Sequence, residues 1–165
     1  MDLDKLQLSS FSIRSLYHNS LIRLNNEQKS PDSDRNNLRS LGANEKNILV
    51  IINNPNAAFL EDTQLTFLTK VISACKLSLS DIALININNI SEGELQSMPA
   101  IFKASKMIMF GVNSMQMQLP FIIPDYQIQN YNNIQYLSAP DLKQIETDQT
   151  AKKQLWASFQ KMFFN

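Results

Sequence analysis

The stretch Lys46–Leu60, KNILVIINNPNAAFL, decides the fold class. Its apolar run, Ile48–Ile52, is rich in β-branched residues, as is typical of a strand that is buried on both faces of a parallel sheet. The run ends abruptly in the loop Asn53–Asn56, NNPN, and an acidic, helix-like stretch follows. Because ligands of α/β proteins bind outside the carboxyl ends of parallel strands, this loop is either a site of chemistry or a structural turn.

Strand-like and helix-like patterns alternate along the rest of the chain. We expect strands at residues 47–52, 81–87, 106–112 and 133–140, helices at 61–76, 91–102, 141–146 and 147–163, and irregular structure at 115–131. Parallel strands need crossover connections, so the alternation predicts a parallel sheet with helices on both faces. The expected fold class is α/β: a three-layer α/β/α domain around a small, mostly parallel sheet of about four strands.

Helix caps and apolar stripes support the expected helices. Ser91 and Glu94 have the spacing of a capping box, Asp141 fits a helix cap, and Thr147 or Asp148 would cap the last helix. Apolar stripes at helical spacing comprise Gln64, Leu65, Leu68, Val71, Ile72 and Cys75 in one helix, and Ala151, Leu155, Phe159 and Met162 in the last one, with Trp156 beside them. If Trp156 is a core residue, its replacement by alanine would cost about 3–5 kcal/mol.

The first 45 residues differ from the remainder, so we divide the chain into an N-terminal segment, 1–45, and a single α/β/α domain, 46–165. Residues 25–47 are polar and turn-rich, which is typical of a linker or a loosely ordered surface segment. Ahead of them lies an apolar island, Phe11–Leu24, with apolar residues on one helical face. This island is either a helix that docks on its own domain or a peptide that folds against a partner.

Charge and cysteine content exclude several classes of protein. The chain has 15 basic and 15 acidic residues, whereas proteins that grip phosphates usually carry a basic excess, so no direct nucleic-acid partner is expected. One cysteine rules out a disulfide framework and indicates a reducing compartment. The sequence shows no secretory signal and no apolar run of membrane-spanning length. We therefore expect a soluble, cytoplasmic protein without a membrane partner.

Catalytic, cofactor and metal motifs are missing from the sequence. His18 is the single histidine, and no Cys or His residues have the spacing of a metal site. The loop after the first strand lacks the glycines of nucleotide-binding motifs, and no nucleophile elbow is present. Cys75 lies on an apolar stripe and is interpreted as a core thiol. We expect no catalytic residue, no cofactor and no metal.

The predicted architecture resembles that of uracil-DNA glycosylases, which carry an activating Asp followed by Pro after their first strand. Here Pro55 is present but Asn54 precedes it, and asparagine cannot act as a base. The histidine that the second glycosylase motif would place in the C-terminal half is also missing. Because asparagine can read a base edge, Asn53, Asn54 and Asn56, with Asp141, are candidates for a vestigial pocket. The alternative function is therefore a glycosylase-like nucleic-acid-binding domain without activity.

Two blocks of the chain resemble the psi subunit of the bacterial DNA polymerase III holoenzyme. Residues 139–164, APDLKQIETDQTAKKQLWASFQKMFF, contain a strand end, a Pro turn and a capped helix with the pair Leu155-Trp156 followed by aromatic residues. Residues 65–99, LTFLTKVISACKLSLSDIALININNISEGELQSMP, also follow the psi pattern. The chain departs from well-known members by a longer linker at 25–45 and a longer insertion at 113–132.

The resemblance implies a non-catalytic adaptor of the replicative clamp loader, with a sheet of strand order 2-1-3-4. Psi subunits bind the collar of the clamp loader through an N-terminal peptide, so the implied partner is a clamp-loader ATPase subunit. Mapped onto this chain, that peptide is the apolar island, and its anchors are Leu16, Tyr17, Leu21 and Ile22.

The body of psi pairs with the chi subunit, so a chi-like partner is also implied here. Candidates for the second partner surface are Met115, Met117 and Phe121, because Met-rich surfaces adapt to partners. Core packing of these side chains is the other interpretation.

Overall fold

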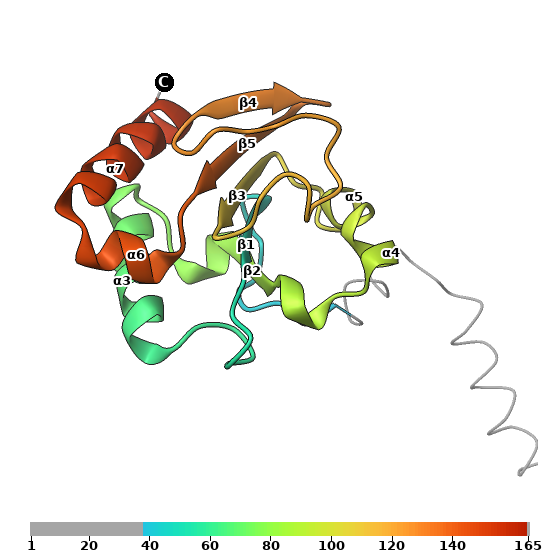
Figure 1. Ribbon diagram of the computed structural model, residues 1–165, viewed down its shortest axis with the longest axis horizontal. Coiled ribbons are helices and arrows are strands. Elements are labelled where there is room, and N and C mark those ends of the chain that lie inside the picture. Colours follow the sequence, from blue (N-terminus) through green and yellow to red (C-terminus); the bar gives the residue numbers. More distant parts are fainter. Residues whose placement is uncertain (1–37, 165) are drawn as a thin grey trace, which may run out of the picture. The chain divides into compact units, whose positions relative to one another are not determined.

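The computed structural model describes residues 38–164, which form a five-stranded, mostly parallel sheet with helices packed against it (Figure 1). The strand order is β2-β1-β3-β5-β4. The strands are β1 (Ile48–Ile52), β2 (Ile82–Asn86), β3 (Lys106–Phe110), β4 (Ile128–Tyr131) and β5 (Ile134–Ala139). All pairings are parallel except that of β4 with β5. The order 2-1-3-4 of the four expected strands is thus confirmed, and a fifth strand is added at one edge.

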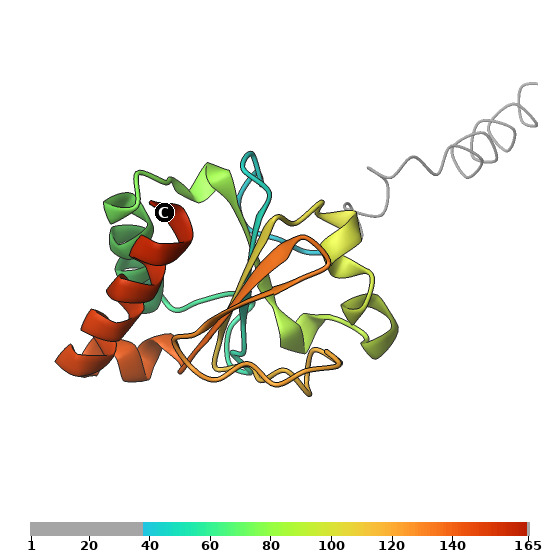
Figure 2. The ribbon, with the colours of Figure 1, turned by 90° about the horizontal axis from the view of Figure 1, so that it is seen from above.

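Helices lie on both faces of the sheet (Figure 2). One face carries α3 (Asp62–Ala74), α6 (Leu142–Thr147) and α7 (Gln149–Phe163). The other carries the short helices α4 (Glu92–Leu95) and α5 (Met98–Ile101), and two 3-10 turns, η1 (Leu79–Asp81) and η2 (Ile87–Asn89), flank β2. None of the helices in residues 38–164 combines the length and the apolar character that crossing a membrane requires.

The central strand β1 is buried on both faces, as its uninterrupted apolar sequence predicts. Ile48, Val50 and Ile52 belong to the core cluster beneath α3 and α7, whereas Leu49 and Ile51 belong to the cluster beneath α4 and α5. Successive side chains of a strand point to opposite faces, so one strand supplies both cores. Neighbouring strands β2 and β3 pair with β1 along its whole length.

The expected helix caps are confirmed with small adjustments. The carboxylate of Glu94 accepts a hydrogen bond from the backbone N–H of Ser91 at 3.0 Å. The Asp141 and Asp148 side chains accept bonds from backbone N–H groups in the first turns of α6 and α7. The single helix expected at 91–102 is wrong: it is divided into α4 and α5, and Pro99 lies in the first turn of α5, where its missing N–H is tolerated.

The stretch expected to be irregular contains the edge strand β4, which forms a hairpin with β5. Tyr131 and Ile134 are paired, so the turn consists of Asn132 and Asn133 alone. Both turn residues have positive φ, 49° and 63°, as a two-residue hairpin turn of type I′ requires. Asparagine tolerates this left-handed conformation better than other non-glycine residues, so the Asn-Asn pair determines the hairpin.

Residues 38–45, which we assign to the linker from their composition, pack against the sheet instead. Leu38 is buried in the core beneath α4 and α5. Leu41 exchanges two backbone hydrogen bonds with Leu84 of β2, at 2.9 and 2.8 Å. The buried Asn44 donates its side-chain amide to the Phe102 carbonyl at 2.7 Å. This segment therefore covers the outer edge of β2, and the expected linker ends earlier than its polar composition suggests.

Gly42 allows this close approach, so its replacement tests the docking of residues 38–45. Its φ is +104°, and an added Cβ would collide with the carbonyl oxygens of Ile82 and Leu79. We expect Gly42→Ala to lower the free energy of unfolding by more than about 1 kcal/mol in urea denaturation. Gly93 in α4 has open space around it, so Gly93→Ala should be neutral or stabilising by up to about 1 kcal/mol. Equal changes in the free energy of unfolding for the two substitutions would contradict the docking of residues 38–45 on the sheet.

Candidate functional site

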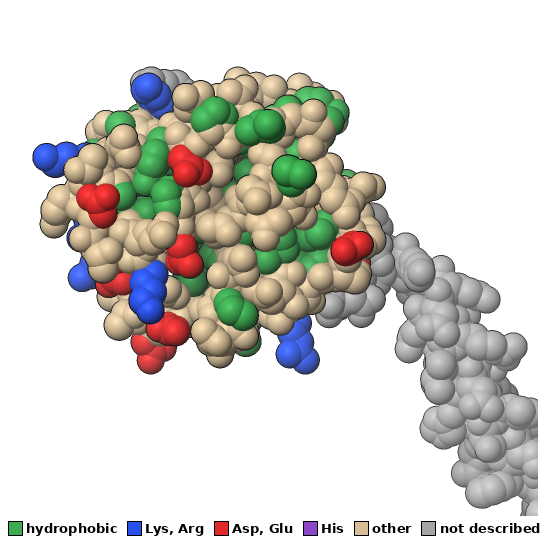
Figure 3. All heavy atoms as spheres, in the orientation of Figure 1, with side chains coloured by type: hydrophobic (Ala, Val, Ile, Leu, Met, Phe, Trp, Pro, Cys, Tyr) green, Lys and Arg blue, Asp and Glu red, His purple; other side chains and the backbone are tan. Residues whose placement is uncertain are grey.

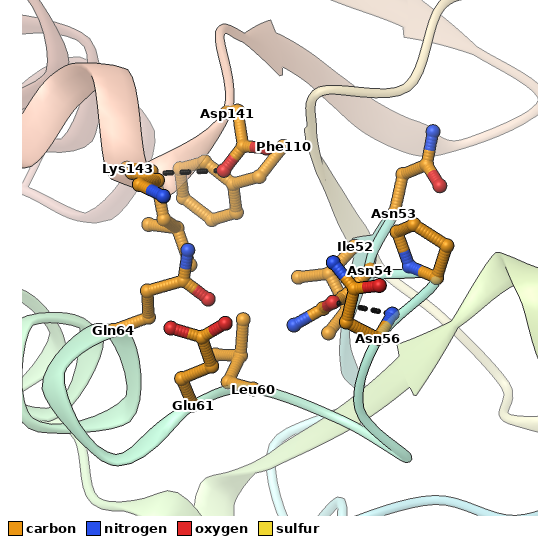
Figure 4. A pocket seen from close by; sticks show the side chains of 12 residues that line it. Ile52, Asn53, Asn54, Asn56, Leu60, Glu61, Gln64, Phe110, Asp141 and Lys143 are labelled. Carbon is orange, nitrogen blue, oxygen red and sulfur yellow. Dashed lines mark hydrogen bonds between the residues drawn. The ribbon is translucent and has the colours of Figure 1, made fainter.

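A polar hollow of about 120 Å³ lies at the carboxyl ends of β1 and β3, where ligands of α/β folds bind (Figure 4). It is lined by Ile52, Asn53, Asn54, Pro55, Asn56, Leu60, Glu61, Gln64, Phe110, Asp141, Leu142 and Lys143. The structure therefore brings the three loop asparagines and Asp141 to one place. The hollow is much smaller than the roughly 300–1,000 Å³ of ordinary small-molecule sites.

The side chains of the loop are used to hold the loop itself. The Asn54 Oδ1 accepts the backbone N–H of Asn56 at 3.0 Å, which is the bond of an Asx turn. The Asn53 Oδ1 accepts a bond from the Asn88 side-chain amide at 2.7 Å. Two of the acceptors that could read a ligand are thus already occupied. The geometry favours a structural turn over a site of chemistry.

Asn86, at the carboxyl end of β2, is the polar residue on which this loop depends. Its side chain is fully buried, and its Nδ2 donates to the carbonyl oxygens of Asn54 at 2.6 Å and Ala57 at 2.9 Å. Its Oδ1 accepts the backbone N–H of Asn54 at 3.1 Å. The sequence pattern did not single out this residue. The available signal was an asparagine that ends an otherwise apolar strand and must find partners when buried.

Two carboxylates, those of Asp141 and Glu61, border the hollow. Asp141 accepts the backbone N–H of Lys143 at 3.0 Å and so acts as the expected cap of α6. Glu61 lies across the hollow from Asn56 (Figure 4). Within residues 38–164, no group of His, Cys, Asp and Glu is arranged to hold a metal ion.

Gln64 lines the same hollow and is the least satisfied of its polar side chains. The residue is 7% exposed, and its Oε1 is buried without a hydrogen-bond partner among the described residues. A buried carbonyl without a partner costs about 1–3 kcal/mol. The sequence pattern placed Gln64 on the buried stripe of its helix, which is confirmed, but the unpaired oxygen could not be foreseen.

Cys75 is a core residue, as predicted. It is buried beneath α3 and α7, and burial raises the pKa of its thiol to about 11. The thiolate is the nucleophilic form, so this side chain is unreactive at neutral pH.

The predicted anchors Leu16, Tyr17, Leu21 and Ile22, and the single histidine His18, lie outside the described residues. Their roles stay predictions.

The predicted second partner surface is not one surface. Met115 is 80% exposed, but Met117 is 3% exposed and belongs to the core beneath α4 and α5. Phe121 is partly buried and stacks against Tyr131 and Tyr136 at centroid distances of 4.9 and 5.6 Å. Including Met117 was therefore wrong, because the insertion folds back onto the sheet and this side chain fills the core.

A more coherent apolar surface lies between α3 and α7. Leu155 points into the core, but the adjacent Trp156 is 36% exposed and is not the core residue that we considered. Trp156 packs edge-to-face against Phe164, with ring centroids 6.5 Å apart, and Phe164 is itself 49% exposed. The groove beside Trp156 has a volume of about 240 Å³ and is lined by five apolar side chains and two lysines of the two helices.

No protein-family model matches this chain, and no match is found among curated proteins. Membership of the psi family therefore stays a prediction from the sequence pattern.

The hydrogen bonds of Asn86 predict that this residue stabilises the loop. Asn86→Ala would leave the carbonyls of Asn54 and Ala57 without their donor, so the free energy of unfolding should fall by about 2 kcal/mol or more. The exposed Asn56 side chain provides the control, since Asn56→Ala should change stability by less than about 0.5 kcal/mol. Urea denaturation of the two variants measures both values, and a stable Asn86→Ala protein would contradict the structural role.

Proposed function

We propose that this chain is a non-catalytic adaptor subunit of the replicative DNA polymerase clamp loader. In this role the N-terminal apolar island binds the clamp-loader ATPase subunit, and the body binds a second replication protein, which can be a chi-like subunit. Both contacts are protein–protein interactions and need no catalytic group.

The observation that carries the proposal is the exposure of Trp156 on α7. This helix holds the Leu155-Trp156 pair on which the resemblance to psi rests. Within the pair, Leu155 stabilises the fold, whereas Trp156 borders an apolar groove. Exposed aromatic side chains beside apolar grooves are typical of protein-binding surfaces, so the same helix that suggests the family also presents a surface for a partner.

The strand order gives further support. We took the order 2-1-3-4 from the resemblance to psi and not from the residues, and the sheet has this order in its parallel strands. Other α/β families share this arrangement, so the strand order supports the fold implied by the resemblance and the exposed surface supports the function.

The alternative, a glycosylase-like nucleic-acid-binding domain, has weaker support. Its pocket would be the hollow beside Asn53, Asn54 and Asn56, which measures about 120 Å³. The Oδ1 atoms of Asn53 and Asn54 already accept hydrogen bonds from protein groups. These amides already take part in holding the loop, and the hollow is smaller than an ordinary ligand site, so we propose the adaptor function alone.

Binding to the clamp-loader ATPase subunit of the same organism tests the proposal. We expect the full-length chain to capture the purified subunit in a pull-down. Replacing two proposed anchors, in the double variant Leu16→Ala/Leu21→Ala, should weaken capture at least tenfold, which corresponds to about 1.4 kcal/mol of binding free energy. The polar pair Ser15→Ala/Asn19→Ala in the same segment serves as the matched control.

Melting temperatures of the variants separate the two interpretations of the apolar island. If the island binds a partner, the anchor variant should melt at the same temperature as the wild type. A large drop in its melting temperature would make residues 11–24 part of the fold. Failure of the full-length chain to capture the ATPase subunit would refute the clamp-loader assignment.

A further inference from the structure

The groove between α3 and α7 has an unusual distribution of charge around an apolar floor. Its lining consists of Phe67, Lys70, Val71, Ala74, Lys152, Leu155 and Trp156. The two cations of this lining, Lys70 and Lys152, come from opposite helices, so a positive charge lies on each side of the hollow. No acidic residue lines the groove.

The two helices extend this positive character beyond the groove. α7 contains three lysines, Lys152, Lys153 and Lys161, and no acidic residue. α3 contains Lys70 and is followed by Lys76, and its one acidic residue, Asp62, lies in its first turn. The acidic residues of these helices lie at their N-terminal ends, as Glu61, Asp62 and Asp148, so the positive charge is concentrated at the groove itself. Figure 3 shows both basic and acidic side chains on the side of the molecule that carries α7.

The lysines of this face have no acidic partners within the described part of the chain. The ion pair found in residues 38–164 joins Lys46 to Asp81 at 3.5 Å and does not involve this face. Lys152 instead extends over the ring of Phe67, with its Nζ 5.8 Å from the ring centroid. Its charge is thus held at the rim of the groove, next to the apolar floor.

Charge complementarity decides which occupant fits. A second copy of this chain that packed through the same face would bring the same lysines against each other, and like charges across an interface are strongly unfavourable. The apolar island of this chain, residues 11–24, carries Arg14 and Arg23 and no acidic residue, so it is also repelled. An occupant with carboxylates would satisfy Lys70 and Lys152.

The apolar floor of the groove favours a peptide over a nucleic acid as its ligand. Nucleic-acid strands bind along continuous basic tracks with flat aromatic rings on which bases stack. Here the indole of Trp156 packs edge-to-face against Phe164, and the hollow beside it is apolar. An aliphatic or aromatic side chain fills such a hollow well, whereas a phosphate backbone gains nothing from it.

We propose that the α3–α7 groove binds an acidic peptide segment of a partner protein, which inserts an apolar side chain beside Trp156 and places carboxylates near Lys70 and Lys152. This inference shares one premise with the proposed function, namely that the chain binds another protein. It adds that the contact segment of that protein is acidic and carries an apolar side chain.

A selection of short random peptides on the full-length chain tests the inference. We expect the enriched peptides to carry net negative charge and at least one large apolar residue. Trp156 is the single tryptophan of the chain, so its fluorescence reports directly on occupancy of the groove when an enriched peptide is synthesised and titrated. Affinity should fall as salt concentration rises, because the charges are near the surface.

Charge-reversal variants locate the binding surface. We expect the double variant Lys70→Glu/Lys152→Glu to bind the titrated peptide at least tenfold more weakly than the wild type, which corresponds to about 1.4 kcal/mol of binding free energy. The variant Arg39→Glu/Lys103→Glu makes the same change in net charge at exposed positions outside the groove and should bind like the wild type. Circular dichroism checks that both variants are folded.

Several outcomes would overturn the inference. They are the enrichment of neutral or basic peptides, the failure to enrich any peptide, and binding that is equally weakened in both charge-reversal variants. A fluorescence response to oligothymidylate without one to acidic peptides would identify a nucleic acid as the occupant. If the chain binds acidic peptides but does not capture the clamp-loader subunit, the inference about the groove stands and only the proposed clamp-loader role is refuted.

Discussion

The burial of β1 on both faces and along both edges is the constraint on which the rest of the structure depends. Its five residues, Ile48–Ile52, lie at the centre of the sheet and are at most 3% exposed. A strand with no polar side chain can be solvated on neither face, so helices must cover both. Parallel neighbours on both edges then require crossover connections, and those crossovers supply the covering helices.

This constraint also explains the polar cluster at the carboxyl end of the strand. The chain leaves β1 between two buried neighbours, and its backbone groups need hydrogen-bond partners where water is excluded. Asn86 provides several of them from the adjacent strand. The result is a loop whose polar atoms stabilise the fold, in a position that many α/β enzymes use for chemistry. The surface that we propose for partner binding lies elsewhere, on the covering helices, where α3 and α7 leave a groove beside Trp156.

Much of this architecture could be predicted from the sequence, because periodicity and caps are local signals. The strands β1, β2 and β3 coincide with largely apolar runs, β5 lies in the expected segment that Pro140 closes, and α7 begins at the expected cap, Asp148. The hairpin was missed because its turn has Asn-Asn where glycine is the usual signal, and β4 is short and only partly buried. The docking of residues 38–45 was missed because Leu38 and Leu41 stand alone in a polar stretch, and the backbone hydrogen bonds and the glycine that complete the docking leave no sequence pattern.

The candidate sites were less predictable than the fold. The sequence pattern grouped Met117 with Met115, but only the tertiary structure decides which methionine of the insertion fills the core. Likewise, Leu155 and Trp156 are adjacent in a helix, so one of them had to face away from the core. The groove lysines are a further example: Lys70 and Lys152 come from two helices that are about eighty residues apart in the chain, and their grouping exists only in the fold.

Photo-crosslinking from position 156 in living cells tests most directly whether the chain acts through the α3–α7 groove. A photoreactive amino acid would replace Trp156 in the full-length chain, and the same amino acid at the exposed Ile122, in the 113–132 insertion, would serve as the comparison. We predict an adduct from position 156 with an acidic segment of a replication protein, identified by mass spectrometry. Adducts formed from position 122 but not from position 156, or adducts with nucleic acid, would contradict the adaptor surface described here.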